Sequence, residues 1–236
     1  MADELDIIAF RRALHRRPEL SFRETGTHDL IARTLDGLGI AHRTVAGVLA
    51  RIEGRGDLRR AVVLRADIDA LPIREQADVA WRSLNDGVMH ACGHDVHTAV
   101  LMGVLQEFNR SRDFEGTLLG LFQPGEECNP GGASLVLAEE PFADYDVRAV
   151  IGEHVEPSLE VGTFGFRAGK YMASSDELRF TVHGTGGHAA LRNQLRDPVA
   201  AAAELVGGLL ALNLPERVLS IGRIEADGAT NVVPDD

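Results

Sequence analysis

Hydrophobic positions along the chain predict helices near the N-terminus and buried strands after them. Apolar side chains that recur every three or four residues predict one helix over residues 5–17 and another over 27–38, where Gly39 is a natural stop. Almost wholly apolar runs follow at residues 61–66, 117–122 and 147–151. Such runs, separated by helical segments, are typical of strands buried on both faces of a sheet. We therefore predict an α/β fold.

The pattern changes from about residue 172. A half-exposed strand, a long helix and a second strand are predicted there, at residues 176–183, from Pro198 onward and at 217–225. A glycine-rich turn follows the first of these strands. We therefore predict one domain over residues 1–171 and the start of a second, smaller α+β domain over residues 172–236.

Each of the three apolar runs stops at residues that can bind a metal or transfer a proton. These residues are Asp67 and Asp69, Glu126 and Glu127, and His154. A single acidic residue after a strand is usually part of a plain polar loop. In open α/β sheets, however, ligands bind outside the carboxyl ends of the strands. Because three runs end in this way, we expect these side chains to converge on one edge of the sheet.

Residues 89–99 contain the densest group of metal-binding side chain types, with Cys92, His94 and His97 among them. A mostly apolar helix is predicted from Thr98, which places Cys92 and His94 on a loop at its N-terminus, where a thiolate is favoured. A structural zinc site would need a second ligand pair, and Cys128 is the only other cysteine. A catalytic metal site is therefore the favoured interpretation, with structural zinc or coincidental histidines as alternatives.

Composition narrows the classes of partner and location. The net charge of −12 argues against nucleic acid and anionic membranes as partners. Two cysteines do not make a disulfide framework, and the acidic first residues do not resemble a secretory signal. The longest apolar run is too short to span a bilayer. These features favour a protein of the cytoplasm.

Six segments in order along the chain resemble a family of metal-dependent amidohydrolases. The family includes aminoacylases, hippurate hydrolases and auxin-conjugate hydrolases, and is related to zinc carboxypeptidases. The segments are residues 15–21, 65–72, 85–95, 122–127, 153–157 and 186–190. The resemblance implies a catalytic domain with a mostly parallel or mixed sheet flanked by helices. It also implies a ferredoxin-like lid domain, here incomplete, through which the protein forms a homodimer.

The resemblance also implies a role for each candidate residue. The implied ligands of one or two divalent ions, Zn²⁺ or Mn²⁺ with Co²⁺ as a further candidate, are Cys92, His94, Glu127 and His154. The residues expected to support these ligands are Asp67, Asp69 and His97. Glu126 is implied as the general acid–base, His188 as the lid residue that stabilises the oxyanion, and Asn231 as a substrate contact.

The expected reaction is hydrolysis of the amide bond of an N-acyl amino acid or a small peptide by a metal-activated water. Glu126 and Glu127 are adjacent, so their side chains diverge, and one can bind metal while the other moves a proton. The alternative is a non-catalytic metal-binding or dimerisation fragment. An intact Glu126 argues against this alternative, because a binding module needs no spare carboxylate beside a ligand.

Two departures from the family pattern affect these expectations. Arg192 and Asn193 stand where the family often has Pro-His, which is expected to change lid contacts or substrate preference. The family pattern also returns to the catalytic domain for a last histidine ligand, whereas this sequence stops at Asp236. We therefore expect the 236-residue chain by itself to bind metal weakly, to associate through uncovered surface and to lack catalytic competence.

Overall fold

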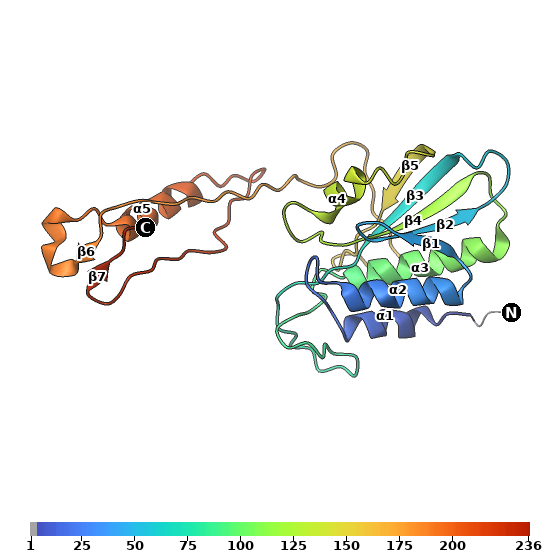
Figure 1. Cartoon of the computed structure of the whole chain (residues 1–236), viewed down its shortest axis with the longest axis horizontal. Helices are drawn as coiled ribbons and strands as arrows, with labels where there is room; N and C mark the ends of the chain where they lie inside the picture. The colour runs from blue at the N-terminus through green and yellow to red at the C-terminus, as the bar shows by residue number, and fades with distance from the viewer. Residues whose placement is uncertain (1–3) are drawn as a thin grey trace. The chain divides into compact units, whose positions relative to one another are not determined.

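A mixed β-sheet is the framework of the first part of the chain, in a computed structural model that describes residues 4–236 (Figure 1). The described residues up to Ala168 form one unit, and those from Gly169 onward form a second. In order across the sheet, the strands are β1 (Ala41–Thr44), β2 (Val48–Glu53), β4 (Thr117–Gln123), β3 (Arg60–Asp67) and β5 (Asp146–Gly152). Strand β3 runs parallel to β4 and β5, whereas β2 runs antiparallel to β1 and β4.

Helices cover both faces of this sheet. The helices α1 (Ile7–His15), α2 (Thr25–Gly37) and α3 (His94–Ser111) lie on one face, and α4 (Gly132–Ala138) lies on the other (Figure 1). Successive side chains of β2 alternate between the two cores, because strand residues point to opposite faces. Ala50 packs in the core beneath α1–α3, and Leu49 packs with Val136 of α4. No described helix is both long and apolar enough to cross a membrane.

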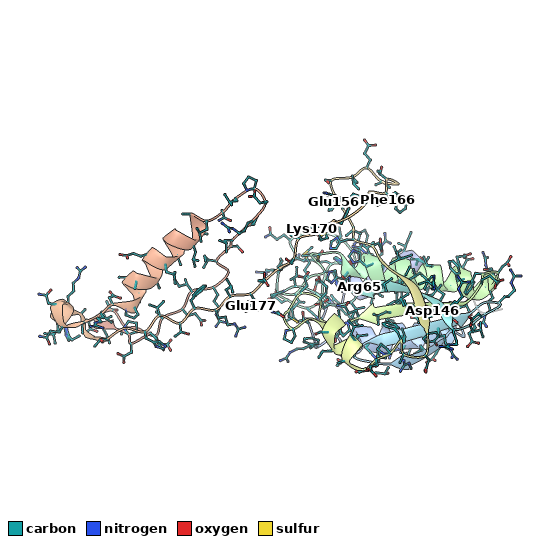
Figure 2. All side chains as sticks on the ribbon, turned by 90° about the horizontal axis from the view of Figure 1, so that it is seen from above. Arg65, Asp146, Glu156, Phe166, Lys170 and Glu177 are labelled. Atoms are coloured by element: carbon teal, nitrogen blue, oxygen red, sulfur yellow. The ribbon has the colours of Figure 1, made fainter. Side chains whose placement is uncertain are left out.

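The three predicted apolar strands form, but they are not equally buried. Every residue of β4 is buried, as expected for a central strand. Strand β5 lies at the sheet edge instead, and Val150 and Ile151 are 65% and 53% exposed. The prediction of burial on both faces is therefore wrong for β5, because no described helix covers this edge strand. Arg65 on β3 and Asp146 at the start of β5 mark these neighbouring strands in Figure 2.

The parallel register places the ends of the strands together. Asp67, the last residue of β3, pairs with Gln123, the last residue of β4. Helix α3 begins at His94, four residues earlier than predicted, so His94 belongs to its first turn and not to the preceding loop. Gly93 makes this start possible, because its φ of +93° is a left-handed conformation that glycine adopts readily. The segments expected to carry chemistry therefore meet at the carboxyl edge of the sheet.

The second unit holds α5 (Pro198–Leu210), the 3₁₀ helix η1 (Ala189–Gln194), and the two-residue strands β6 (Gly187–His188) and β7 (Val232–Val233). The predicted cap of α5 forms, with the Asp197 side chain accepting from the N–H groups of Val199 and Ala200. The strands predicted at residues 176–183 and 217–225 do not form. Strands need a hydrogen-bonded partner, and these segments have no ladder with any described strand. The ferredoxin-like lid stays a prediction.

A buried polar cluster joins α1, α3 and the loop that precedes α3. His15 is 5% exposed. Its Nδ1 lies 2.9 Å from Asp95 Oδ2, and its Nε2 lies 3.1 Å from Glu75 Oε1. Arg11 Nε lies 2.6 Å from the same oxygen of Asp95. The hydrogen bond with Asp95 raises the pKa of His15 above 6.5, although burial opposes this shift. The cluster fixes the first turn of α3 against α1.

The raised pKa of His15 predicts a pH-dependent stability. A group with a raised pKa in the folded state contributes fully below its unfolded pKa, and the contribution is lost as pH rises through the folded pKa. In metal-free protein, His15→Gln should reduce the free energy of unfolding by about 1–3 kcal/mol near pH 6 and by less above pH 8. Urea unfolding across this range measures the difference. His28→Gln, at a half-buried position of α2, is the control. Equal pH dependence in wild type and His15→Gln would contradict the prediction.

Candidate metal centre

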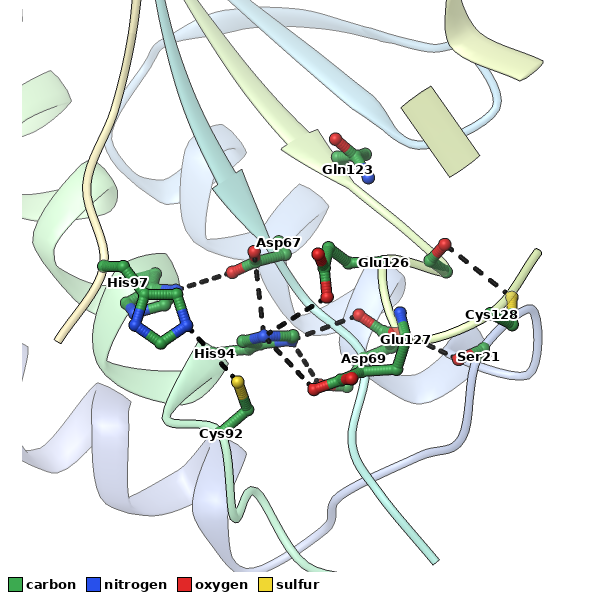
Figure 3. Close-up of polar contacts among 12 residues, drawn as sticks. Ser21, Asp67, Asp69, Cys92, His94, His97, Gln123, Glu126, Glu127 and Cys128 are labelled. Atoms are coloured by element: carbon green, nitrogen blue, oxygen red, sulfur yellow. Dashed lines mark hydrogen bonds and ion pairs between the residues drawn. The ribbon is translucent and has the colours of Figure 1, made fainter. Parts of the chain in front are cut away.

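His94 lies at the centre of a group of acidic side chains at the carboxyl edge of the sheet (Figure 3). Its Nε2 is 3.7 Å from both Asp67 Oδ2 and Glu127 Oε1, and 4.0 Å from Glu126 Oε2. Asp67 ends β3, and Glu126 and Glu127 follow β4, so the parallel strands bring these carboxylates together. The expected convergence of the strand ends is therefore present.

The orientation of the His94 ring is set by Asp69. His94 Nδ1 lies 2.9 Å from the Asp69 carbonyl oxygen and 3.2 Å from Asp69 Oδ1, so this nitrogen carries a hydrogen and donates. Nε2 then presents its lone pair to the carboxylate group, the arrangement found in metal-binding histidines. His94 Nε2 and Glu127 Oε1 are both buried without a hydrogen-bond partner. Two such atoms 3.7 Å apart fit a cation between them.

Cys92 and His154 meet on the same side of the sheet. Cys92 Sγ lies 3.3 Å from His154 Nε2. His154 Nδ1 donates a hydrogen bond to the Val155 carbonyl oxygen at 2.8 Å, so the lone pair of Nε2 is available to a metal ion. Cys92, His94 and His154 each offer a ligand atom within 4.8 Å of the others. Ligands about 2.0–2.3 Å from one tetrahedral ion stand about 3.5 Å apart, so this spacing suits a shared ion.

Two further groups satisfy the same 4.8 Å condition, and both include His94. They are His94 with Glu126 and Glu127, and His94 with Asp67 and His97. His97 differs from the others, because its Nδ1 is 2.6 Å from Asp67 Oδ1 and its Nε2 accepts from Val155 N–H at 3.0 Å. With both ring nitrogens in use, His97 is placed to orient Asp67 and not to offer a lone pair.

The charges around Cys92 and Glu126 are predominantly negative. Burial and the neighbouring Glu127 carboxylate raise the pKa of the Cys92 thiol to about 12. Burial and the same neighbour raise the pKa of Glu126. A cation among these groups would reverse the effect of the negative charges and favour the thiolate. The mixture of sulfur, imidazole and carboxylate ligands suits Zn²⁺ and related divalent ions.

Asp69 connects several of these segments. Burial opposes its ionisation, but hydrogen bonds from His94, from Glu127 N–H at 2.9 Å and from Ser21 Oγ at 2.7 Å lower its pKa to about 2. Asp69 is therefore a carboxylate at any ordinary pH. It contacts the ring of His94 and the backbone of Glu127, and so fixes the spacing between these two residues.

Asp67 is held in a similar way by a cation and a histidine. Arg65 Nη1 lies 2.7 Å from Asp67 Oδ2, and Arg65 Nε donates to Gln123 Oε1 at 2.8 Å. Sequence analysis assigned no role to Arg65 or to Ser21, although both lie in segments that carried the family resemblance. Their partners could not be identified locally: Ser21 is 48 residues from Asp69, and Arg65 is 58 residues from Gln123.

The two candidates from the second unit lie near one another within that unit. His188 ends β6 and pairs with Val232 of β7, and the Asn231 carbonyl oxygen accepts from Ala189 N–H at 2.9 Å. The exposed His188 ring accepts from Ala190 N–H through Nδ1 at 3.2 Å. This leaves Nε2 available, and the roles of His188 and Asn231 stay predictions.

Comparison with known proteins assigns the chain to a family. Residues 63–222 match the sequence model of peptidase family M20/M25/M40. The chain belongs to this family. N-acetylcysteine deacetylase of Bacillus subtilis is 41% identical over 240 residues, which cover 97% of this chain and 62% of the relative. N-acyl-L-amino acid amidohydrolase of Geobacillus stearothermophilus is 40% identical over 246 residues, which cover 99% and 66%.

Solved structures of the family have the same fold. A dinuclear metal-binding peptidase of the M20 family from Bacillus subtilis is 37% identical, with a TM-score of 0.70. The match covers 97% of this chain and 60% of that structure. The chain spans less than two thirds of each of these three proteins.

Cys92 and Cys128 offer a matched test of the metal centre. Cys128 Sγ lies 3.7 Å from the Gly125 carbonyl oxygen and belongs to no candidate ligand group among the described residues. Cys92→Ser should reduce Co²⁺ affinity by at least about tenfold and abolish the sulfur-to-metal charge-transfer band, and Cys128→Ser should change neither. Equilibrium dialysis and absorption spectroscopy measure both properties.

Wild-type affinity should also rise with pH, because binding of the ion must displace the thiol proton of Cys92. The expected slope is up to about tenfold in affinity per pH unit for each proton released, and it should be smaller in Cys92→Ser. A charge-transfer band that survives in Cys92→Ser would show that Cys92 is not a ligand.

Proposed function

We propose that the protein is a metal-dependent amidohydrolase that cleaves the amide bond of N-acyl amino acids or small peptides. The observation that carries this proposal is the pair of adjacent carboxylates, Glu126 and Glu127, facing the same nitrogen of His94. Similar proteins named N-acetylcysteine deacetylase and N-acyl-L-amino acid amidohydrolase support the substrate class.

Cys92, His94, Glu127 and His154 are the proposed ligands of one or two divalent ions. Zn²⁺ fits this mixed ligand set well, and Mn²⁺ and Co²⁺ suit the carboxylate-rich side of it. When bound, the metal would supply a water of low pKa and polarise the carbonyl of the amide. Asp67, Asp69 and His97 are proposed to hold the ligands in place through the hydrogen bonds described above.

Glu126 is the proposed general acid–base. Burial and the adjacent Glu127 raise its pKa, which brings a carboxyl group closer to the range where it can both accept and donate a proton. One oxygen of Glu126 would take a proton from the attacking water, and the same group would then donate a proton to the leaving nitrogen. The side chains differ in exposure, 42% for Glu126 and 22% for Glu127, which favours the more open one for contact with substrate.

The second unit is proposed as a lid. His188 would donate through Nε2 to the developing oxyanion, and Asn231 would contact the substrate, with residues 1–171 forming the catalytic domain. The exposed apolar residues Val199 and Leu210 of α5 support a homodimer through this unit. Two free thiols suit the reducing cytoplasm, where a thiolate ligand is not lost to a disulfide.

Substitution of each carboxylate separates the two proposed roles. Glu126→Gln should retain metal and lose hydrolysis of N-acetyl amino acids by about 10²–10⁴-fold, because the proton carrier is gone. Glu127→Gln should lose metal affinity instead. Metal analysis and turnover, measured in the protein expressed from its natural gene, distinguish these outcomes. Glu107→Gln, on the exposed side of α3, is the control and should change neither.

The same measurements decide between function classes. Wild-type turnover in Glu126→Gln would remove the proposed acid–base, and the reverse pattern of metal loss would exchange the two roles. A wild-type protein that binds metal and hydrolyses no member of an N-acyl amino acid and dipeptide panel would favour the non-catalytic metal-binding alternative.

A further inference from the structure

The turn from Ser21 to Glu24 is the last part of the connection from α1 to α2, and it contacts two of the segments that build the metal centre. Ser21 Oγ donates to Asp69 Oδ2 at 2.7 Å, and Asp69 and Ser21 are both visible in Figure 3. Glu24 Oε1 accepts from Gly125 N–H at 2.8 Å. Gly125 immediately precedes the Glu126–Glu127 pair, so this turn touches both sides of the acidic group.

Glu24 occupies the N-cap position of α2 without capping the helix. Its side chain makes no capping hydrogen bond, although this position normally satisfies free N–H groups of the first turn. The side chain of Glu19 caps the helix instead, and it accepts from Gly26 N–H at 3.0 Å and from Thr27 N–H at 2.7 Å. The carboxyl of Glu24 is therefore not required by its own helix and is directed to the loop that carries Glu126.

Burial makes the placement of Glu24 costly. The residue is 5% exposed, and burial raises the pKa of its carboxyl group. The described residues show no ion pair for it, and the hydrogen bond to Gly125 is its long-range contact. A buried carboxyl group lowers stability unless it is hydrogen-bonded. The backbone amides of Glu24 itself and of Phe22 also stabilise its charged form, and the amide of Gly125 is the group that it holds in a distant segment.

Phe22 restricts the same loop by steric contact. Gly125 has a φ of +56°, and a Cβ there would lie 2.5 Å from a ring carbon of Phe22. Phe22 itself has a φ of +60°, which is uncommon for a residue other than glycine. The ring thus packs against the backbone of Gly125 and limits the space for the loop on that side.

We propose that the turn from Ser21 to Glu24 positions the Glu126–Glu127 pair, with Glu24 as the positioning residue. The backbone N–H groups of Gly125 and Glu127 lie on either side of Glu126. The turn contacts the first directly and the second through one intermediate residue. Glu24 binds the first, at Gly125, and Ser21 reaches the second through Asp69, whose Oδ2 also accepts from Glu127 N–H at 2.9 Å. The divergence of the two carboxylates is thereby fixed before any ligand binds. This inference rests on the proposed function for its catalytic meaning.

Three variants separate positioning of the loop from general stability. Glu24→Ala removes the acceptor, Glu24→Gln keeps an oxygen at the same place, and Glu19→Gln disrupts only the cap of α2. The readouts are Co²⁺ affinity, the visible spectrum of the Co²⁺-loaded protein, and hydrogen exchange at the Gly125 amide in metal-free protein.

Glu24→Ala should weaken Co²⁺ binding by about tenfold, alter the spectrum and accelerate exchange at Gly125. Glu24→Gln should stay within about threefold of wild type. Glu19→Gln should lower the Tm while leaving affinity and spectrum unchanged.

The outcomes distinguish this inference from the proposed function. A wild-type protein that binds no Co²⁺ would overturn the proposed function, and exchange at Gly125 would still test the positioning. Wild-type affinity, spectrum and exchange in Glu24→Ala would overturn the inference while leaving the metal centre intact. If Glu24→Ala does not fold, Ser21→Ala takes its place, since it deletes a single oxygen. It should weaken Co²⁺ binding and alter the spectrum, and unchanged values for both would overturn the inference.

Discussion

The first unit depends on keeping several carboxylates together at the carboxyl edge of a parallel strand pair. Asp67, Asp69, Glu126 and Glu127 surround one imidazole, and like charges at such distances repel strongly where water is excluded. Asp67 and Asp69 are each held by specific donors, whereas Glu126 and Glu127 turn carboxylate oxygens toward His94 Nε2 with no donor to either side chain among the described residues. The fold thus preserves an arrangement that is unfavourable without a cation, which is the expected property of a preformed metal site.

The contacts that orient the candidate ligands come from segments far apart in sequence, so the site depends on several parts of the first unit at once. The ring of His94 is fixed by Asp69, the ring of His97 by Asp67 and Val155, and the first turn of α3 by the His15–Asp95 pair. No single loop carries more than part of the centre. Displacement of one segment therefore disturbs hydrogen bonds in others, because the groups share acceptor atoms.

Sequence alone predicted which segments meet at the carboxyl edge of the sheet because their signal is local. A buried apolar run followed by an acidic residue or a histidine marks a strand end, and this pattern led to Asp67, Glu127 and His154.

The short strands β1 and β2 were not predicted, since their composition is mixed and their pairing depends on distant partners. Ser21 and Glu24 had no assignable role for the same reason, because their acceptor or donor lies 48 and 101 residues away. The strands expected in the second unit do not form. Alternation of polar and apolar residues predicts a strand only where a neighbouring strand completes the hydrogen-bond ladder.

The approach of Cys92 to His154 has a further consequence for the unbound chain. These residues are 62 positions apart, and an ion held by both would close a loop of that length. In the polymer treatment used for disulfides, closing such a loop removes chain entropy worth about 4 kcal/mol from the unfolded ensemble. A metal at this site would therefore act as a reversible cross-link, made or removed by chelation. The segment after β5, whose residues are almost all exposed, would then be most open to proteolytic nicking whenever the ion is absent.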